Sequence, residues 1–212
     1  MDDLIEGYRR FRNREWHERH ATYQALARDG QAPKAMVVAC SDSRVDPAMI
    51  FGAGPGELFI VRNVANLVPP YAPDGASHAT SAALEFGVRV LQVQHLIVLG
   101  HAMCGGIAAL RKGLPYPIGE FLEPWMRNAQ EAMDRALADA TADAQTACEL
   151  EAVKLSLSNL ITFPWIRERV SDEQLRLHGA TFDIRSGVLS ILQPDGQFAP
   201  VSAPPHPSTS SE

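Results

Sequence analysis

Two cysteines and a histidine stand at the ends of two apolar segments of this chain. Cys40 follows residues 35–39, while His101 and Cys104 follow residues 96–100. Apolar runs of this length, bounded by turn residues, are typical of buried parallel strands. Ligands gather at the carboxyl ends of such strands, so the three side chains are expected to converge. Two thiolates and one imidazole form a zinc-binding set that leaves a fourth position to fill, as in a catalytic zinc site.

An acid and a base follow the first cysteine closely. Asp42 and Arg44 stand two and four residues after Cys40, so a short loop can turn both toward the metal. The arginine stays protonated and can bind the carboxylate through two parallel hydrogen bonds. Held in this way, Asp42 stays off the metal and can accept a hydrogen bond from a zinc-bound water. The alternative is an exposed ion pair worth about 0–1 kcal/mol, and the pair by itself does not exclude it.

Two other kinds of site compete with a catalytic metal. A cysteine phosphatase needs Cys-x5-Arg around a glycine-rich loop, but the arginine here is the fourth residue after Cys40, and position 46 is Asp. A structural zinc closed by Cys148 is the second alternative, although Cys148 lies in a predicted helix, where free cysteine is usually a buried core residue. The remaining histidines are interpreted as surface or satisfied core residues; they are His17, His20, His78, His95, His178 and His206.

Composition and charge narrow the class of protein. The 212 residues are 46% hydrophobic and 21% charged, which suits one α/β domain of ordinary composition. A net charge of −6 without a basic cluster makes nucleic acid an unexpected partner. The first residues are acidic, unlike a signal peptide, and no apolar run approaches the ~20 residues that span a bilayer. We therefore expect a cytoplasmic protein without a membrane partner, in which the three cysteines do not form a disulfide framework.

Strand and helix patterns alternate along the chain, and this predicts an α/β fold with a mostly parallel central sheet flanked by helices. The predicted strands are 34–39, 57–61, 95–100, 175–184 and 187–193, the last two joined as a hairpin. The predicted helices are 2–28 (as two helices), 46–52, 77–92, 104–112, 127–160 with a break near Thr141, and 166–170. The glycines at 52–56 precede a strand and lack phosphate-loop spacing, so they are interpreted as a turn.

The domain boundaries follow from the same pattern. Residues 1–199 form a single domain, within which residues 1–30 are a helical arm, and the proline- and serine-rich residues 200–212 are expected to be a disordered tail. Apolar residues recur with helical spacing in residues 2–28. Such a stripe must cover either this domain or a partner.

Three segments in order resemble the β-class carbonic anhydrases. They are Cys-Ser-Asp-Ser-Arg at 40–44, Arg-Asn-Val-Ala-Asn at 62–66 and Gly-His-Ala-Met-Cys-Gly-Gly at 100–106. The resemblance implies reversible hydration of CO2 to bicarbonate and a proton. It also implies a homodimer or a higher multiple of dimers, whose N-terminal helices wrap the partner subunit, which would cover the apolar stripe.

The resemblance also assigns roles to single residues. It implies zinc on Cys40, His101 and Cys104, with water or, in a closed state, Asp42 as the fourth ligand. It implies a CO2 pocket, partly reached across the dimer, that is lined by Gln31, Phe59, Val64, Phe86 and Gly105. Gln31 matches the glutamine with which plant-type members bind an anion. Phe86 departs from the tyrosine usual in that subgroup, so one pocket hydroxyl is missing.

Some bacterial members bind a second, non-catalytic bicarbonate that favours the closed state. By resemblance that site uses a tryptophan, an arginine and a tyrosine, whereas this chain has Val37, Arg62 and Phe182. Each lost partner costs a buried anion roughly 1–3 kcal/mol. A ligand without differential affinity for two states cannot shift their populations. We therefore expect an open site, with Asp42 bound to Arg44.

Two alternative functions stay open at this point. A hydrolase of carbonyl sulfide or carbon disulfide on the same scaffold would differ in access to the pocket, which the sequence does not reveal. A non-catalytic protein stabilised by zinc would have no use for Asp42 and Arg44 as a pair.

Overall fold

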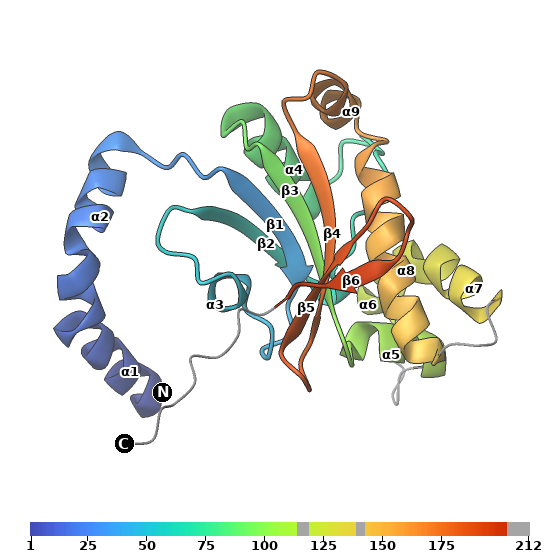
Figure 1. Cartoon of the computed structure of the whole chain (residues 1–212), viewed down its shortest axis with the longest axis horizontal. Coiled ribbons are helices and arrows are strands. Elements are labelled where there is room, and N and C mark those ends of the chain that lie inside the picture. Colours follow the sequence, from blue (N-terminus) through green and yellow to red (C-terminus); the bar gives the residue numbers. More distant parts are fainter. Residues whose placement is uncertain (114–118, 139–142, 203–212) are drawn as a thin grey trace.

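The computed structural model describes residues 1–113, 119–138 and 143–202. Its centre is a six-stranded sheet with the order β2-β1-β3-β4-β5-β6 (Figure 1). The strands are β1 (Ala35–Cys40), β2 (Leu58–Asn63), β3 (His95–His101), β4 (Arg176–Asp183), β5 (Val188–Leu192) and β6 (Phe198–Pro200). β2, β1, β3 and β4 run parallel, and β5 and β6 are antiparallel additions at one edge. The predicted α/β fold is confirmed.

Helices and helical turns connect the strands. They are α1 (Asp2–Asn13), α2 (Glu15–Asp29), α3 (Pro47–Ile50), η1 (Val64–Asn66), α4 (Ala79–Glu85), the π-helical turn η2 (Phe86–Val90), α5 (Gly105–Lys112), α6 (Leu122–Met126), η3 (Arg127–Ala129), α7 (Gln130–Ala138), α8 (Ala144–Leu160) and α9 (Pro164–Ser171). None of the helices in the described ranges is long and apolar enough to cross a membrane.

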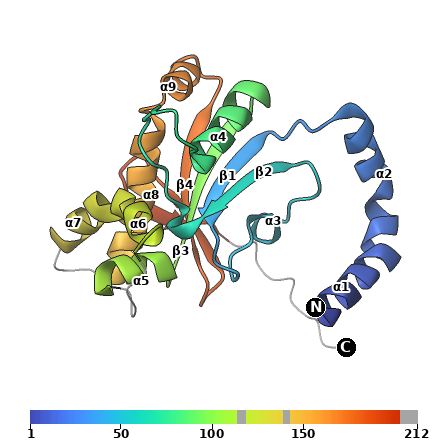
Figure 2. The same ribbon diagram turned by 180° about the vertical axis from the view of Figure 1, so that it is seen from behind.

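The two faces of the sheet are covered unequally. Alternate residues of β1 and β3, such as Met36 and Leu96, pack against Leu84 of α4, Val153 of α8 and Ile166 of α9. Figure 2 shows α4 in front of this face, with α5, α6 and α7 grouped to its left around α8. The opposite face carries a smaller cluster formed by Val37, Ala39, Leu99 and Ala180, against which α3 places Ile50. On this second face, apolar residues such as Ile60 and Ile97 are only partly buried, so they remain accessible to another subunit.

The structure departs from the predicted elements in two places. The predicted helices leave a gap between residues 112 and 127, but α6 forms within it, with Pro124 in its first turn, where proline is tolerated. The expected tail begins at Pro200, yet Pro200 ends β6 and the Val201 N–H donates to the Leu189 carbonyl at 2.8 Å. The predicted helix break near Thr141 and the rest of the tail, 203–212, lie outside the described residues.

The N-terminal arm stands apart from the sheet in both views (Figures 1 and 2). Neither α1 nor α2 contains a buried residue. Their own contacts are aromatic: Trp16 stacks on Tyr23 with 5.1 Å between ring centroids, and Phe11 meets Trp16 edge to face. Leu4 and Tyr8 are 73% and 60% exposed. The apolar stripe expected from the sequence is present, and its own subunit covers only part of it, where Leu26 lies against Gly56.

Deleting residues 2–28 is predicted to abolish assembly. The truncated chain should run as a monomer or become insoluble, because its exposed apolar surfaces then lose their partner. Size-exclusion chromatography with light scattering measures the outcome. Leu4→Ser with Tyr8→Ser should weaken the oligomer, whereas Glu6→Gln on the polar side should not. A truncated chain that keeps the full-length oligomer would assign the stripe to another role.

Candidate metal centre

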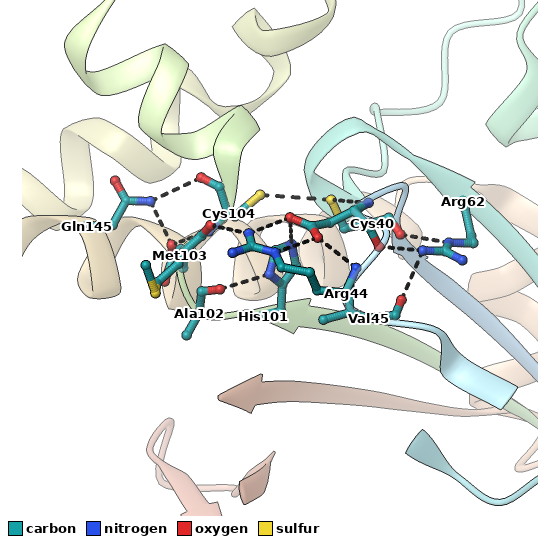
Figure 3. Close-up of polar contacts among 11 residues, drawn as sticks. Cys40, Arg44, Val45, Arg62, His101, Ala102, Met103, Cys104 and Gln145 are labelled. Carbon is teal, nitrogen blue, oxygen red and sulfur yellow. Dashed lines mark hydrogen bonds and ion pairs between the residues drawn. The ribbon is translucent and has the colours of Figure 1, made fainter. Parts of the chain in front are cut away.

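Three ligand residues meet at the carboxyl end of the sheet. Cys40 ends β1, His101 ends the adjacent parallel strand β3, and Cys104 precedes α5 as its N-cap. Their Sγ and imidazole nitrogen atoms all lie within 4.8 Å of one another. All three residues are buried, with 5%, 1% and 1% of their surface exposed. The predicted convergence of these side chains is confirmed (Figure 3).

The spacing of the ligand atoms fits zinc. Cys40 Sγ and Cys104 Sγ are 4.0 Å apart. A disulfide would need ~2.05 Å, whereas two sulfurs at ~2.3 Å from a tetrahedral zinc lie ~3.8 Å apart. His101 Nδ1 donates to the Ala102 carbonyl at 2.9 Å, which places the proton on Nδ1. His101 Nε2 is buried without a hydrogen-bond partner, so its lone pair is available to a metal.

The two thiols cannot both ionise unaided. The Cys104 thiol is the main cause that lowers the pKa of Cys40 to about 4, and His101 with the backbone amides of Asp42 and Ala65 adds to this effect. In turn, the Cys40 thiolate raises the pKa of Cys104, although amides at the start of α5 act in the opposite direction. A second thiolate at this distance therefore requires a cation between the sulfurs, and a divalent metal supplies it.

Unusual backbone conformations shape the loops around the ligands. Ala65 and Met103 have positive φ angles of 67° and 58°, which non-glycine residues seldom adopt. A Cβ on Gly106 would lie 2.8 Å from Val64 Cγ1, so glycine allows α5 to approach η1 closely. A Cβ on Gly105 would meet nothing within 4 Å, so this residue leaves open space beside the ligands.

Arg44 holds the Asp42 carboxylate in a two-pronged ion pair. Arg44 Nε donates to Asp42 Oδ1 at 2.9 Å, and Nη2 donates to Oδ2 at 2.7 Å. The guanidinium holds the pKa of Asp42 well below its usual range, so the carboxylate stays ionised. Asp42 Oδ2 lies 3.9 Å from His101 Nε2 and thus faces the ligand group. The expected pairing of Asp42 with Arg44 is present.

Arg44 also connects the two ligand loops. Its Nη2 donates to the Met103 carbonyl at 3.1 Å, next to Cys104. One side chain therefore orients the Asp42 carboxylate and ties the loop after β1 to the loop after β3.

Arg62 fixes the first of these loops from the other side. Its Nε donates to the Cys40 carbonyl at 2.9 Å, and its Nη2 donates to the carbonyls of Asp42 and Val45 at 2.6 and 3.0 Å. Its Nη1 lies 3.4 Å from Asp46. Because these contacts use the N–H groups of the Arg62 guanidinium, few remain to bind an anion.

Behind the site, α8 contributes a buried acid. Glu149 is 5% exposed, and its Oε1 accepts hydrogen bonds from the Cys104 backbone N–H at 2.8 Å and from Gln145 Nε2 at 2.6 Å. Gln145 Nε2 also lies 3.2 Å from the Cys104 carbonyl. Desolvation raises the pKa of Glu149, while its two hydrogen-bond donors lower it. The pair fixes the backbone on both sides of Cys104 and thereby positions its sulfur.

The residues expected to line the CO2 pocket fall into two groups. Val64 and Gly105 lie beside the ligands, and the Val64 carbonyl accepts a hydrogen bond from Trp125 Nε1 at 2.8 Å. The other three lie toward the opposite end of the sheet: Gln31 precedes β1, Phe59 pairs with Met36, and Phe86 packs on Phe59 at 5.7 Å between centroids. One subunit does not bring these three to the ligands, so their role remains a prediction that needs a second subunit.

Cys148 does not belong to the ligand group. It is fully buried in α8 among apolar residues, and burial raises its pKa to about 11. Within the described ranges, the three ligands Cys40, His101 and Cys104 form the one cluster suited to a metal. The interpretation of Cys148 as a core residue is confirmed.

Sequence reasoning missed three residues that support the site, namely Gln145, Glu149 and Trp125. A signal for Glu149 exists, because it recurs at helical spacing with Ala152, Val153, Ser156 and Leu160, all buried on one side of α8. A carboxylate on an apolar helix face needs a partner. No comparable pattern marks Trp125, whose role depends on where α6 packs.

Comparisons with known proteins agree with this geometry. A family model described as "Carbonic anhydrase" matches residues 35–189. Beta carbonic anhydrase 3 of Arabidopsis thaliana is 38% identical over 211 residues, which cover 96% of this chain and 81% of that protein. This chain belongs to the β-class carbonic anhydrase family.

Solved structures of the family share the fold. The β-carbonic anhydrase CcaA superimposes with a TM-score of 0.86 at 29% identity, covering 96% of this chain and 92% of that one. A tetrameric β-carbonic anhydrase from Sordaria macrospora gives a TM-score of 0.77 at 28% identity, covering 93% of this chain and 98% of that one. As a member of this family, the chain is an enzyme, and its Cys-His-Cys group is suited to a metal.

The ligand set is predicted to bind one zinc per chain through two sulfurs and one nitrogen. X-ray absorption at the zinc edge should give Zn–S near ~2.3 Å and Zn–N near ~2.0–2.1 Å. Cys40→Ser should lose most of the metal, whereas Cys148→Ser, a matched change at a buried cysteine outside the group, should retain it. A shell of four sulfurs, or equal zinc loss in both variants, would contradict this assignment.

Proposed function

We propose that this chain catalyses the reversible hydration of CO2 to bicarbonate and a proton, with zinc held by Cys40, His101 and Cys104. The observation that carries the proposal is the ion pair of Asp42 and Arg44 beside a buried three-ligand group. A purely structural metal site needs no such pair, and a fourth protein ligand within the described residues is absent from the group. Zinc at this position supplies an acidified water, so that hydroxide is available near neutral pH.

Asp42 orients the nucleophile in this proposal. The Arg44 backbone N–H donates to Asp42 Oδ1, and the Arg44 guanidinium donates to both carboxylate oxygens. Oδ2 keeps a second lone pair, which faces the ligand group. An ionised carboxylate accepts hydrogen bonds and does not donate them. Asp42 therefore fixes where the proton of the nucleophile points and turns the remaining lone pair toward the carbon of CO2.

Arg44 keeps this geometry from collapsing. By holding both carboxylate oxygens, it prevents Asp42 from moving into the ligand group. Its additional bond to the Met103 carbonyl anchors the guanidinium to the second loop, so the position of Asp42 is set by both loops. Arg62 holds the carbonyls of the same loop and thereby limits its freedom.

The substrate side of the site is apolar, which suits CO2. Val64 faces this side and is 37% exposed, and Gly105 leaves open space next to it. An uncharged gas with weak acceptor atoms loses little when it leaves water for such a surface. We place Gln31, Phe59 and Phe86 of a second subunit opposite this surface, because the same residues of one subunit lie away from its own ligands.

Assembly through the arm follows from the same reasoning. The incompletely covered stripe of α1 and α2 and the lightly covered sheet face complement each other in apolar character. The similar Sordaria macrospora enzyme is a tetramer. A homodimer or a multiple of dimers is therefore the assembly that we propose. Hydrolysis of carbonyl sulfide or carbon disulfide would use the same ligands, and no feature of the described pocket favours it.

Arg44→Ala is expected to retain zinc while CO2 hydration falls by roughly 100-fold or more. Without its partner, the pKa of Asp42 returns toward its ordinary value and the carboxylate is free to enter the ligand group. Stopped-flow hydration assays with parallel zinc analysis measure both quantities. Arg44→Lys keeps the charge but loses the two-pronged geometry, so an intermediate rate is expected. Near-normal turnover in Arg44→Ala would remove this residue from the mechanism.

Bicarbonate is expected to act as a simple product inhibitor. Arg62 is occupied by loop carbonyls, and Val37 and Phe182 offer a buried anion no donors. Steady-state rates at several bicarbonate concentrations and pH values should fit hyperbolic inhibition, and activity should fall along one titration as the pH drops. Cooperative inhibition, or Asp42 found on the metal at neutral pH in a crystal, would show that a closed state is populated.

A further inference from the structure

A cavity of about 550 Å³ opens beside Val64. Its walls come from the end of β2, the first turn of α4 and the helix α6, and they include Phe121, Leu122 and Trp125. Trp125 closes one side by its hydrogen bond to the Val64 carbonyl. At ~30 Å³ per molecule, a space of this size admits several waters. The cavity therefore extends from Val64 to the start of α4.

His78 is the ionisable side chain on the described walls of this cavity. It precedes α4 as its N-cap residue, and its side chain is 42% exposed, so it borders both the cavity and bulk solvent. Polar side chains also stand on the walls. Asn63 Nδ2 donates to Thr80 Oγ1 at 3.2 Å, and both residues line the cavity together with Ser77 and Ser81.

Asp74 sets the tautomer of His78. His78 Nε2 lies 2.7 Å from Asp74 Oδ1. The Ala76 backbone N–H donates to the same oxygen at 2.8 Å, which fixes the carboxylate within its loop. The imidazole is the main cause that lowers the pKa of Asp74, so the carboxylate is ionised and accepts the Nε2 proton. In neutral His78 the lone pair is then on Nδ1, and a proton taken up there leaves an imidazolium that faces a carboxylate.

The proposed reaction requires such a group. Each hydration turnover converts CO2 and water into bicarbonate and one proton, and that proton must leave a site whose protein ligands are buried. Near neutral pH, free hydroxide is too scarce to remove it quickly, and an imidazole is the side chain best matched to this task. Asp74 faces His78, and Glu123 of α6, next to the lining residue Leu122, is directed to Arg127 at 3.9 Å.

We infer that His78, oriented by Asp74, is the residue that accepts the product proton through water in this cavity and passes it to buffer. The proton released by the attacking water adds to Nδ1, and the imidazolium then loses a proton to a solvent base, which restores neutral His78. Asp74 is a positioning residue in this scheme, because it touches the imidazole alone. This inference rests on CO2 hydration as the proposed function.

Proton transfer and CO2 attack are separated by steady-state kinetics. With His78→Ala in dilute buffer, kcat should fall at least about 10-fold, because proton release becomes limiting. The ratio kcat/KM should stay within about twofold, because it reports the steps up to CO2 attack. Added imidazole should restore kcat toward the wild-type value by taking the proton directly.

Two further variants test the arrangement. Asp74→Asn should lower kcat less than His78→Ala, because the imidazole stays on the cavity wall but loses the carboxylate that orients it, and added imidazole should restore kcat while kcat/KM stays unchanged. Ser77→Ala alters the same wall without removing an ionisable group, and both kinetic parameters should stay at wild-type values.

The outcomes distinguish this inference from the function on which it rests. A wild-type enzyme that does not hydrate CO2 would overturn both. Normal wild-type hydration, combined with an unchanged kcat in His78→Ala, would overturn the proton-acceptor role alone. Equal losses of kcat and kcat/KM without rescue by imidazole would also overturn it, because they would indicate a structural defect.

Discussion

Two cysteine sulfurs held 4.0 Å apart in a buried position impose the main constraint on this structure. Two thiolates repel each other strongly at this distance in a medium of low polarity, so they persist together only around a cation. Backbone amides from η1, from the loop after β1 and from the start of α5 reduce this repulsion but do not remove it. The geometry of the two loops therefore makes sense as a preformed receptor for a metal.

Charged side chains surround the two cysteines, and each is held by hydrogen bonds. Arg44 and Arg62 bring two positive charges to the loop after β1, and both are satisfied by groups of that loop or of its neighbour. Glu149 brings a carboxyl group close to Cys104, where desolvation raises its pKa. Its placement is tolerated because it accepts two hydrogen bonds in a buried position. Precise backbone placement is gained at an electrostatic cost.

The sequence alone predicts the parts of the site that depend on local pattern. Cys40, His101 and Cys104 follow apolar runs, and parallel strands bring their ends together whatever the helices do. Asp42 and Arg44 lie so close in sequence to Cys40 that one loop determines their pairing. Glu149 and Trp125 could not be placed in this way, because each reaches the site through helix packing over long sequence separations. The contact of a second group with the ligands cannot be predicted from one chain. This group is Gln31, Phe59 and Phe86, which one subunit holds away from its own ligands.

The two sides of the metal group differ in what holds them. The imidazole of His101 is oriented by the carbonyl of Ala102, a backbone atom that every residue type possesses. The backbone of Cys104 is held by the side chains of Glu149 and Gln145, which mutation can remove. A substitution at Ala102 keeps the carbonyl that orients the His101 imidazole. A substitution at Glu149 or Gln145 removes a hydrogen bond that holds the backbone of Cys104. Tolerance to mutation in this enzyme is therefore distributed unevenly around its three ligand residues.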